Sequence, residues 1–322
     1  MMRSPVTRVA DAVVLRGVVR HFGAVHAVDG VDLEVERGEL FGLIGHNGAG
    51  KSTLIRLMLG LIEPGAGEIR IDGQPVNGRG FRDVRRRIGW LPENVVLYDN
   101  LSGHETMAYF AKLKGADRAE IGPLLERVGL ADAAQRPVRE YSKGMRQRLG
   151  FAQALLGKPA VLFLDEPTTG LDPAAIRDFY ATLRELRQAG TTVIVTSHIL
   201  AELQERVDRL ALLAHGRVQA TGSVQQLRER MALPLDVSLR ATSVEALPAL
   251  QAALAGLPVQ DLSCDGAELR AHLPRASKMA LLRALAMLPA EWVDDVQVHE
   301  PTLEDVYFAL RENRQPTIGS AS

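Results

Sequence analysis

The feature that most constrains the fold is a glycine-rich loop between an apolar run and a run with helical spacing. Residues 45–52 read Gly-His-Asn-Gly-Ala-Gly-Lys-Ser and match the pattern G-x-x-x-x-G-K-[ST]. The preceding residues 40–44 are apolar and predict a buried strand, and residues 51–59 have the spacing of a helix. Glycines let consecutive N–H groups turn toward a phosphate, and the positive helix end adds to that attraction. The sequence therefore predicts an α/β fold with a nucleotide phosphate site.

The same loop supplies most of the expected nucleotide ligands. Lys51 is expected to reach the β- and γ-phosphates, and Ser52 is expected to ligate Mg²⁺. An ordinary glycine turn is the alternative, and the strand before it and the helix after it disfavour that interpretation. The nucleotide-binding residues predicted in this loop are Gly45, Asn47, Gly48, Ala49, Gly50, Lys51, Ser52 and Thr53.

A second apolar run, residues 161–164, ends in the acids Asp165 and Glu166. Carboxylates at the carboxyl end of a parallel strand face the crevice where ligands bind. Asp165 is suited to hold Mg²⁺, directly or through water, and Glu166 is suited to polarise an attacking water as general base. A polar turn after a strand would be the simpler interpretation, but the phosphate loop in the same chain favours a hydrolytic site.

Composition limits the partners and the compartment. The net charge of −1 gives no basic excess of the kind that nucleic-acid binders carry. The one cysteine, Cys264, cannot form an internal disulfide, which fits a reducing compartment. No apolar run reaches the ~18–20 residues that a membrane-spanning helix needs, and residues 1–20 lack a signal-peptide pattern. We expect a cytosolic chain, and any membrane span would belong to another subunit.

The order of predicted elements divides the 322 residues into two domains and a tail. Residues 1–230 alternate strands and helices around a helical block at about 95–157, whose first helix opens at Ser102 with a capping-box pattern. Residues 231–311 follow the order βαββαβ, the ferredoxin-like pattern of a small α+β domain. A last short helix is expected at 303–310, and residues 312–322 are expected to be a flexible tail.

Four further segments make residues 13–230 similar to the ABC ATPases. Residues 141–148, Tyr-Ser-Lys-Gly-Met-Arg-Gln-Arg, resemble the signature motif of that family. Residues 170–172 resemble its D-loop, residues 197–198 its switch-histidine loop, and residues 91–93 fall where its Q-loop belongs. The resemblance implies a P-loop NTPase of the ABC cassette type with an inserted helical subdomain.

The resemblance also implies that two cassettes enclose two ATP molecules, with Ser142 and Gly144 of one chain facing the phosphates held by the other. ATP and Mg²⁺ are the implied cofactors, and an integral-membrane permease subunit and a second copy of the chain are the implied partners. The chain would then lie on the cytoplasmic face of the inner membrane. The implied catalytic residues are Lys51, Glu93, Glu166 and His198. The further nucleotide-binding residues are Phe22, Ser142, Gly144 and Asp172, and the metal ligands are Ser52, Glu93 and Asp165.

Two positions depart from the family pattern. Lys143 stands inside the signature, where it points to solvent or adds positive charge near the γ-phosphate. Glu93 replaces the usual glutamine, and a carboxylate ~4 Å from a triphosphate charge would cost roughly 4 kcal/mol at an effective dielectric of 20. We therefore expect Glu93 to lie on the metal side, or to stay back until the dimer closes.

Several segments look like one subgroup, the NosF-type ATPases of the copper-processing complex that matures nitrous oxide reductase. They are residues 45–48, 91–95, 110–115, 141–150 and 301–307. This resemblance implies a permease and a periplasmic accessory protein reached through it. The histidines and methionines are scattered along the chain, so we expect no transition-metal site in it. A soluble ABC ATPase acting on ribosomes or DNA, and a nucleotide-gated regulator, remain the alternatives. The C-terminal unit is either a packing or dimerisation module or a regulatory one.

Overall fold

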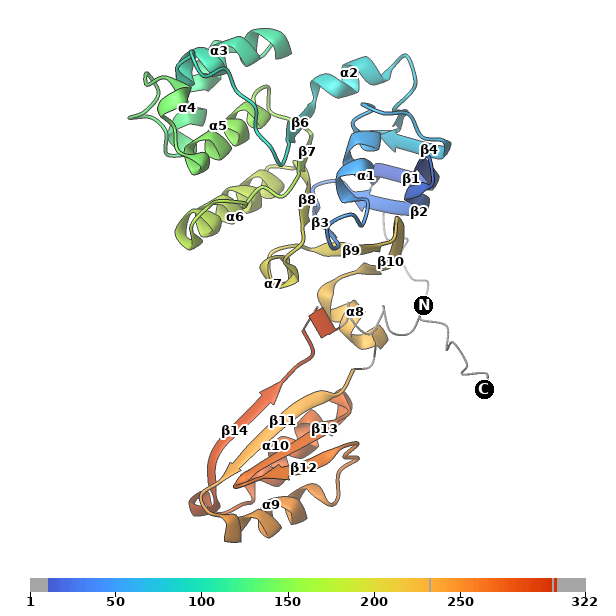
Figure 1. The fold of residues 1–322 in the computed structure, drawn as a ribbon, viewed down its shortest axis with the longest axis vertical. Coiled ribbons are helices and arrows are strands. Elements are labelled where there is room, and N and C mark those ends of the chain that lie inside the picture. Colours follow the sequence, from blue (N-terminus) through green and yellow to red (C-terminus); the bar gives the residue numbers. More distant parts are fainter. Residues whose placement is uncertain (1–10, 232, 303, 306–322) are drawn as a thin grey trace, which may run out of the picture. The chain divides into compact units, whose positions relative to one another are not determined.

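The computed structural model describes residues 11–231, 233–302 and 304–305 (Figure 1). The chain forms two compact units, Met1–Ser223 and Val224–Ser322, and each is described here by itself. The helix predicted at 303–310 falls mostly outside the described residues, and the tail predicted at 312–322 falls wholly outside them.

A six-stranded sheet forms the centre of the first unit, in the order β10-β9-β3-β8-β7-β6. Five of its strands are parallel, and β10 pairs antiparallel with β9. The strands are β3 (Leu40–Ile44), β6 (Ile88–Leu91), β7 (Val161–Leu164), β8 (Thr192–Ser197), β9 (Arg209–Ala214) and β10 (Arg217–Gly222). Every residue of β3, β7 and β8 is buried, which explains why β3 and β7 are unbroken apolar runs in the sequence.

A second, antiparallel sheet has the order β2-β1-β4-β5. Its strands are β1 (Asp11–Phe22), β2 (Val25–Glu36), β4 (Ala66–Ile71) and β5 (Gln74–Pro75), and helix α1 (Lys51–Met58) shares their hydrophobic core. His21 and Phe22 still pair with β2 across the hairpin. The turn falls at Gly23, whose φ of 58° suits glycine.

The helical block lies between β6 and β7 in the chain and contains α3 (Gly103–Lys114), α4 (Ile121–Arg127) and α5 (Lys143–Leu155). The capping box predicted at its start is present: the Ser102 hydroxyl accepts from the Glu105 N–H, and the Glu105 carboxylate accepts from the Ser102 N–H. The remaining helices of the first unit are α2 (Phe81–Arg86), α6 (Pro173–Gln188) and α7 (Leu200–Leu203). Helix α7 is short, because the Arg206 N–H bonds back to the Leu203 carbonyl and tightens the chain into turns.

The second unit begins with α8 (Val224–Met231), after which the elements follow the predicted order βαββαβ. They are β11 (Leu235–Ala241), α9 (Leu247–Leu254), β12 (Leu262–Asp265), β13 (Glu268–Leu273), α10 (Lys278–Ala286) and β14 (Val293–His299). The sheet order β12-β13-β11-β14 is antiparallel throughout, as in ferredoxin-like folds. Leucines of α9 and α10 share one core with alternate residues of β11 and β13.

Candidate nucleotide site

The predicted phosphate loop, acid pair and histidine meet at one edge of the central sheet. They follow β3, β7 and β8, which lie side by side in parallel, so the carboxyl ends of all three strands share that edge. A pocket of about 540 Å³ opens there. It is lined by Phe22, Val25, His26, Ala27, His46, Asn47, Gly48, Gly50, Lys51, Ser52, Thr53, Glu93, Glu166, Thr169 and His198.

The glycines let the phosphate loop pass close to its neighbours. A Cβ at Gly50 would lie 2.3 Å from the Ala27 carbonyl oxygen, and Gly50 also has a φ of 107°. A Cβ at Gly45 would lie 2.4 Å from the Leu213 carbonyl oxygen. Helix α1 starts at Lys51 without a side-chain cap, so its first N–H groups remain available to an anion in the pocket.

Lys51 lies between the loop and the acid. Its ammonium group donates to the Gly45 carbonyl at 2.7 Å and lies 3.1 Å from Glu166 Oε1. Lys51 and Glu166 are both buried, and removal of either side chain would leave the other as an uncompensated buried charge. A phosphate in the pocket would give Lys51 a second anionic partner and would loosen its hold on Glu166.

Neighbouring strands hold Glu166 in an uncommon backbone conformation, with a φ of 48°. Its N–H donates to the Thr196 hydroxyl at 2.8 Å, and that hydroxyl donates to Asp165 Oδ1 at 2.7 Å. His198 Nδ1 lies 2.8 Å from Glu166 Oε2. The acid is therefore fixed by β8 and the residue after it, next to Lys51.

Two predicted residues complete the walls of the pocket. Phe22 ends β1, and 47% of its surface is exposed, so its ring can receive a base by stacking. The Arg20 guanidinium lies 4.8 Å from the centre of that ring. Glu93 follows β6 and also lines the pocket, so its carboxylate can face a phosphate or its metal.

Comparison with known proteins decides the family. The ABC transporter family model matches residues 28–169. The daunorubicin resistance ATP-binding protein DrrA3 of Streptomyces coeruleorubidus is 38% identical over 308 residues, which cover 93% of this chain and 95% of that protein. This chain is an ATP-binding protein of the ABC transporter family. It is therefore an ABC-type ATPase, and its first unit is the ATP-hydrolysing cassette.

Solved structures agree with this cassette fold. The ATP binding subunit of an ABC transporter is 33% identical, with a TM-score of 0.64 over 68% of this chain and 92% of that chain. A second solved structure is 26% identical. It is an ATP-binding cassette solved as a dimer in a post-hydrolysis state with ADP and Pi. Its TM-score is 0.61 over 66% of this chain and 98% of that chain. Cassettes of this family work as dimers with membrane permease subunits.

Several predicted nucleotide-binding residues do not line the pocket of their own chain. Ser142 caps α5 by accepting from the Met145 N–H at 3.2 Å, and Asp172 caps α6 by accepting from the Ala175 N–H at 2.8 Å. Gly144 lies beside Gly170, and neither lines the pocket. The contribution of these residues to a second protomer's site stays a prediction.

Three more predicted residues lie behind the wall. Gly45 and Ala49 shape the loop without lining the pocket, and Asp165 is buried with its Oδ1 bonded to Thr196. The sequence did not point to Thr196, which stands in a β-branched run just before residues 197–198 and belongs to none of the motifs. Only the strand order reveals that its hydroxyl lies between the two acids. Within the described part of the chain, no helix has the length and apolar character needed to cross a bilayer.

Proposed function

We propose that this cassette hydrolyses Mg²⁺-ATP as a homodimer and drives a separate permease that serves copper-site maturation of nitrous oxide reductase. The observation that carries the hydrolytic part is the position of Glu166. It is fixed between Thr196 and His198, next to the lysine of the phosphate loop. An acid held this firmly beside a phosphate pocket is suited to take a proton from water.

The residues around Glu166 divide the remaining work. Ser52, Asp165 and Glu93 offer oxygen atoms, which are the ligands that Mg²⁺ takes, and the ion would offset the charge of the β- and γ-phosphates. Lys51 and the N–H groups of α1 bind the phosphates. His198 orients the attacking water with Glu166 and contacts the γ-phosphate.

Dimerisation is supported by the predicted nucleotide-binding residues that do not line the pocket of their own chain. Ser142 starts α5 and Gly144 lies in its first turn, where free N–H groups suit a phosphate of a second protomer. Closure of such a dimer would move the helical block. At the start of that block, before α3, Val96 is 87% exposed and Tyr98 is 53% exposed, which supports a protein contact such as the permease on this segment.

The maturation role is supported by the segments that resemble NosF-type ATPases, chiefly residues 91–95 and 141–150. The first of these carries Glu93 into the pocket, and the second forms the start of α5. The proposal includes a place on the cytoplasmic face of the inner membrane and a periplasmic accessory protein reached through the permease.

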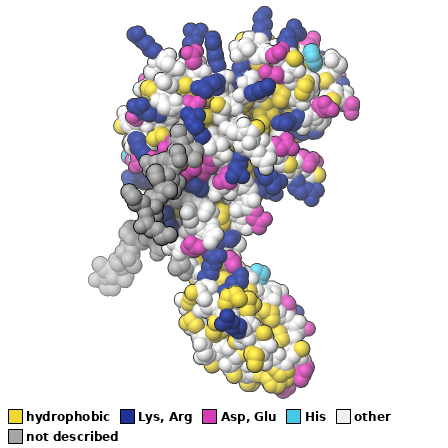
Figure 2. Space-filling model, turned by 180° about the vertical axis from the view of Figure 1, so that it is seen from behind, with side chains coloured by type: hydrophobic (Ala, Val, Ile, Leu, Met, Phe, Trp, Pro, Cys, Tyr) yellow, Lys and Arg dark blue, Asp and Glu magenta, His cyan; other side chains and the backbone are white. Residues whose placement is uncertain are grey.

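The second unit supports dimer formation in this proposal. Figure 2 shows hydrophobic side chains gathered on one of its faces, and Met279, Leu282 and Met287, in or next to α10, are exposed. Exposed apolar side chains of this kind suit a packing or dimerisation module more than a small-ligand sensor.

Export of drug-like molecules is a second candidate, because the match to the daunorubicin resistance protein extends over 95% of that protein. A ribosome- or DNA-directed role is less favoured, since the net charge is −1. A regulator with little turnover is also less favoured, since Glu166 and His198 are in contact.

The two candidates are separated by introducing this gene into a denitrifying host from which the corresponding gene has been deleted. We expect the wild-type gene to restore nitrous oxide reduction and the copper content of purified nitrous oxide reductase, and Glu166→Gln to restore neither. Daunorubicin accumulation is measured in the same strains. The maturation role is refuted if the wild-type protein lowers daunorubicin accumulation while nitrous oxide reduction stays absent.

A further inference from the structure

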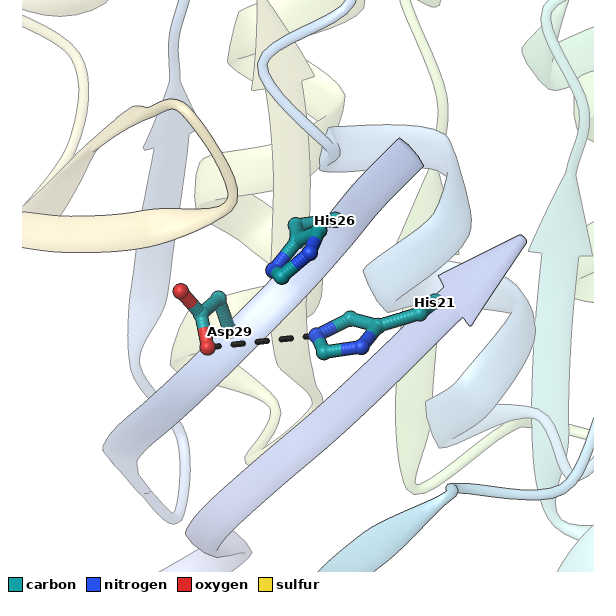
Figure 3. A group of neighbouring side chains, drawn as sticks. All are labelled: His21, His26 and Asp29. Atoms are coloured by element: carbon teal, nitrogen blue, oxygen red, sulfur yellow. Dashed lines mark ion pairs between the residues drawn. The ribbon is translucent and has the colours of Figure 1, made fainter. Parts of the chain in front are cut away.

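Two histidines and an aspartate meet on the β1–β2 hairpin beside the nucleotide pocket (Figure 3). One possible ligand atom from each of His21, His26 and Asp29 lies within 4.8 Å of the others. His21 and His26 are direct partners across the hairpin, and their ring centroids are 3.8 Å apart. The histidines are scattered along the sequence, but the fold brings His21 and His26 together.

We propose that His21, His26 and Asp29 bind a divalent transition metal ion such as Zn²⁺. Two imidazoles and a carboxylate are ligands that this ion takes, at about 2.0–2.2 Å, with further positions left to water or another group. Ligand atoms in a tetrahedral site stand about 3.4 Å apart. His21 Nε2 lies 3.9 Å from Asp29 Oδ1, and both histidines are exposed, so small side-chain rotations bring the three atoms into range.

The carboxylate is already oriented for this role. Asp29 Oδ2 accepts from Arg217 Nε at 2.9 Å and from Arg217 Nη2 at 2.7 Å, which leaves Oδ1 toward His21. The Asp29 N–H also donates to the Gly216 carbonyl at 2.8 Å, so the β9–β10 turn holds the residue at two points. Such outer partners orient metal ligands. Because Arg217 shares the negative charge of Asp29, we expect micromolar rather than nanomolar affinity.

The site would be linked to the nucleotide pocket by the turn that both use. His26 lines the pocket, and Phe22 and Val25 of the same turn line it too. A metal ion held by His21 and His26 would clamp the two ends of this turn and restrict Phe22, which is placed to stack on the base. Metal and nucleotide would then change each other's affinity by the same factor.

Zinc titration of the full chain without nucleotide tests the site, with isothermal calorimetry as the readout and the visible absorption of Co²⁺ as a second probe. We expect one ion per chain, with micromolar affinity, and at least a tenfold loss in His21→Asn. His272→Asn is the matched control, because His272 also lies near one carboxylate, at 3.6 Å from Asp261, but belongs to no group of three possible ligands among the described residues. We expect this control to bind as the wild type does.

The site is ruled out if His21→Asn binds Zn²⁺ as tightly as the wild type, or if the wild type binds it no better than at millimolar concentration. The link to nucleotide is tested by the affinity for a non-hydrolysable ATP analogue in excess Mg²⁺, with and without Zn²⁺. We expect a Zn²⁺-dependent change in the wild type and none in His21→Asn. An unchanged wild-type affinity would remove the link.

Discussion

Thr196→Val removes one hydroxyl that joins both acids of the site. The Thr196 side chain is fully buried, donates to Asp165 Oδ1 at 2.7 Å and accepts from the Glu166 N–H at 2.8 Å. Valine keeps the shape but leaves the Glu166 N–H without its partner, which costs about 1–3 kcal/mol, and removes a bond to a charged group worth about 1.5–3 kcal/mol. Added together, the two losses should lower the free energy of unfolding of the cassette by about 2.5–6 kcal/mol.

Loss of the same hydroxyl should also reduce turnover. Glu166 has a φ of 48°, and its N–H bond to Thr196 holds that conformation. A shift of about 1 Å in a catalytic group costs on the order of 100-fold in rate. We therefore expect Mg²⁺-ATPase activity to fall at least tenfold, measured by phosphate release at saturating ATP.

Thr192→Val is the matched control on the same strand. Thr192 is also buried, and its hydroxyl accepts one bond, from the Gly38 N–H at 3.0 Å, at the opposite end of β8 from the acids. We expect it to cost about 0.5–1.5 kcal/mol and to keep the ATPase activity. Equal losses of stability in the two variants, with full activity in Thr196→Val, would refute the reasoning.

Two further substitutions test the walls of the pocket. Glu93→Gln should keep ATPase activity, because glutamine retains an oxygen ligand and removes a charge that repels the triphosphate; a loss as large as that of Glu166→Gln would contradict this. Gly50→Ala should abolish binding of a fluorescent ATP analogue, because its Cβ would lie 2.3 Å from the Ala27 carbonyl oxygen. Gly190→Ala is the control, because Gly190 also has a positive φ but a Cβ there would have open space around it. We expect this variant to lose stability and to keep ATP binding. Loss of binding in both variants would show that backbone strain, and not the contact with Ala27, is the cause.

Much of the site could be predicted because its chemistry lies in contiguous residues. The phosphate loop follows β3, and the acids Asp165 and Glu166 follow β7. Both strands are buried on both faces, so the sequence shows them as apolar runs that end in polar motifs. The capping box at Ser102 was predictable for the same reason, since all of its atoms lie within four residues.

Features that depend on strand pairing could not be predicted. The hydroxyl of Thr196 lies between the acids only because β8 is the neighbour of β7, and strand order leaves no local pattern in the sequence. The hairpin turn at Gly23 was missed, because it is defined by the pairing of His21 with His26 and not by a local motif. The cluster of His21, His26 and Asp29 was missed with it.

The central claim is that Glu166 is the base of an ATP site completed by a second cassette. The most direct test is the size in solution of Glu166→Gln, with and without Mg²⁺-ATP, measured beside the ATPase activity of the wild type. We expect Mg²⁺-ATP to convert the variant from monomer to dimer, because ATP binds but is not hydrolysed, while the wild type hydrolyses ATP. A variant that hydrolyses ATP at the wild-type rate, or that stays monomeric at saturating Mg²⁺-ATP beside an inert wild type, would contradict the claim.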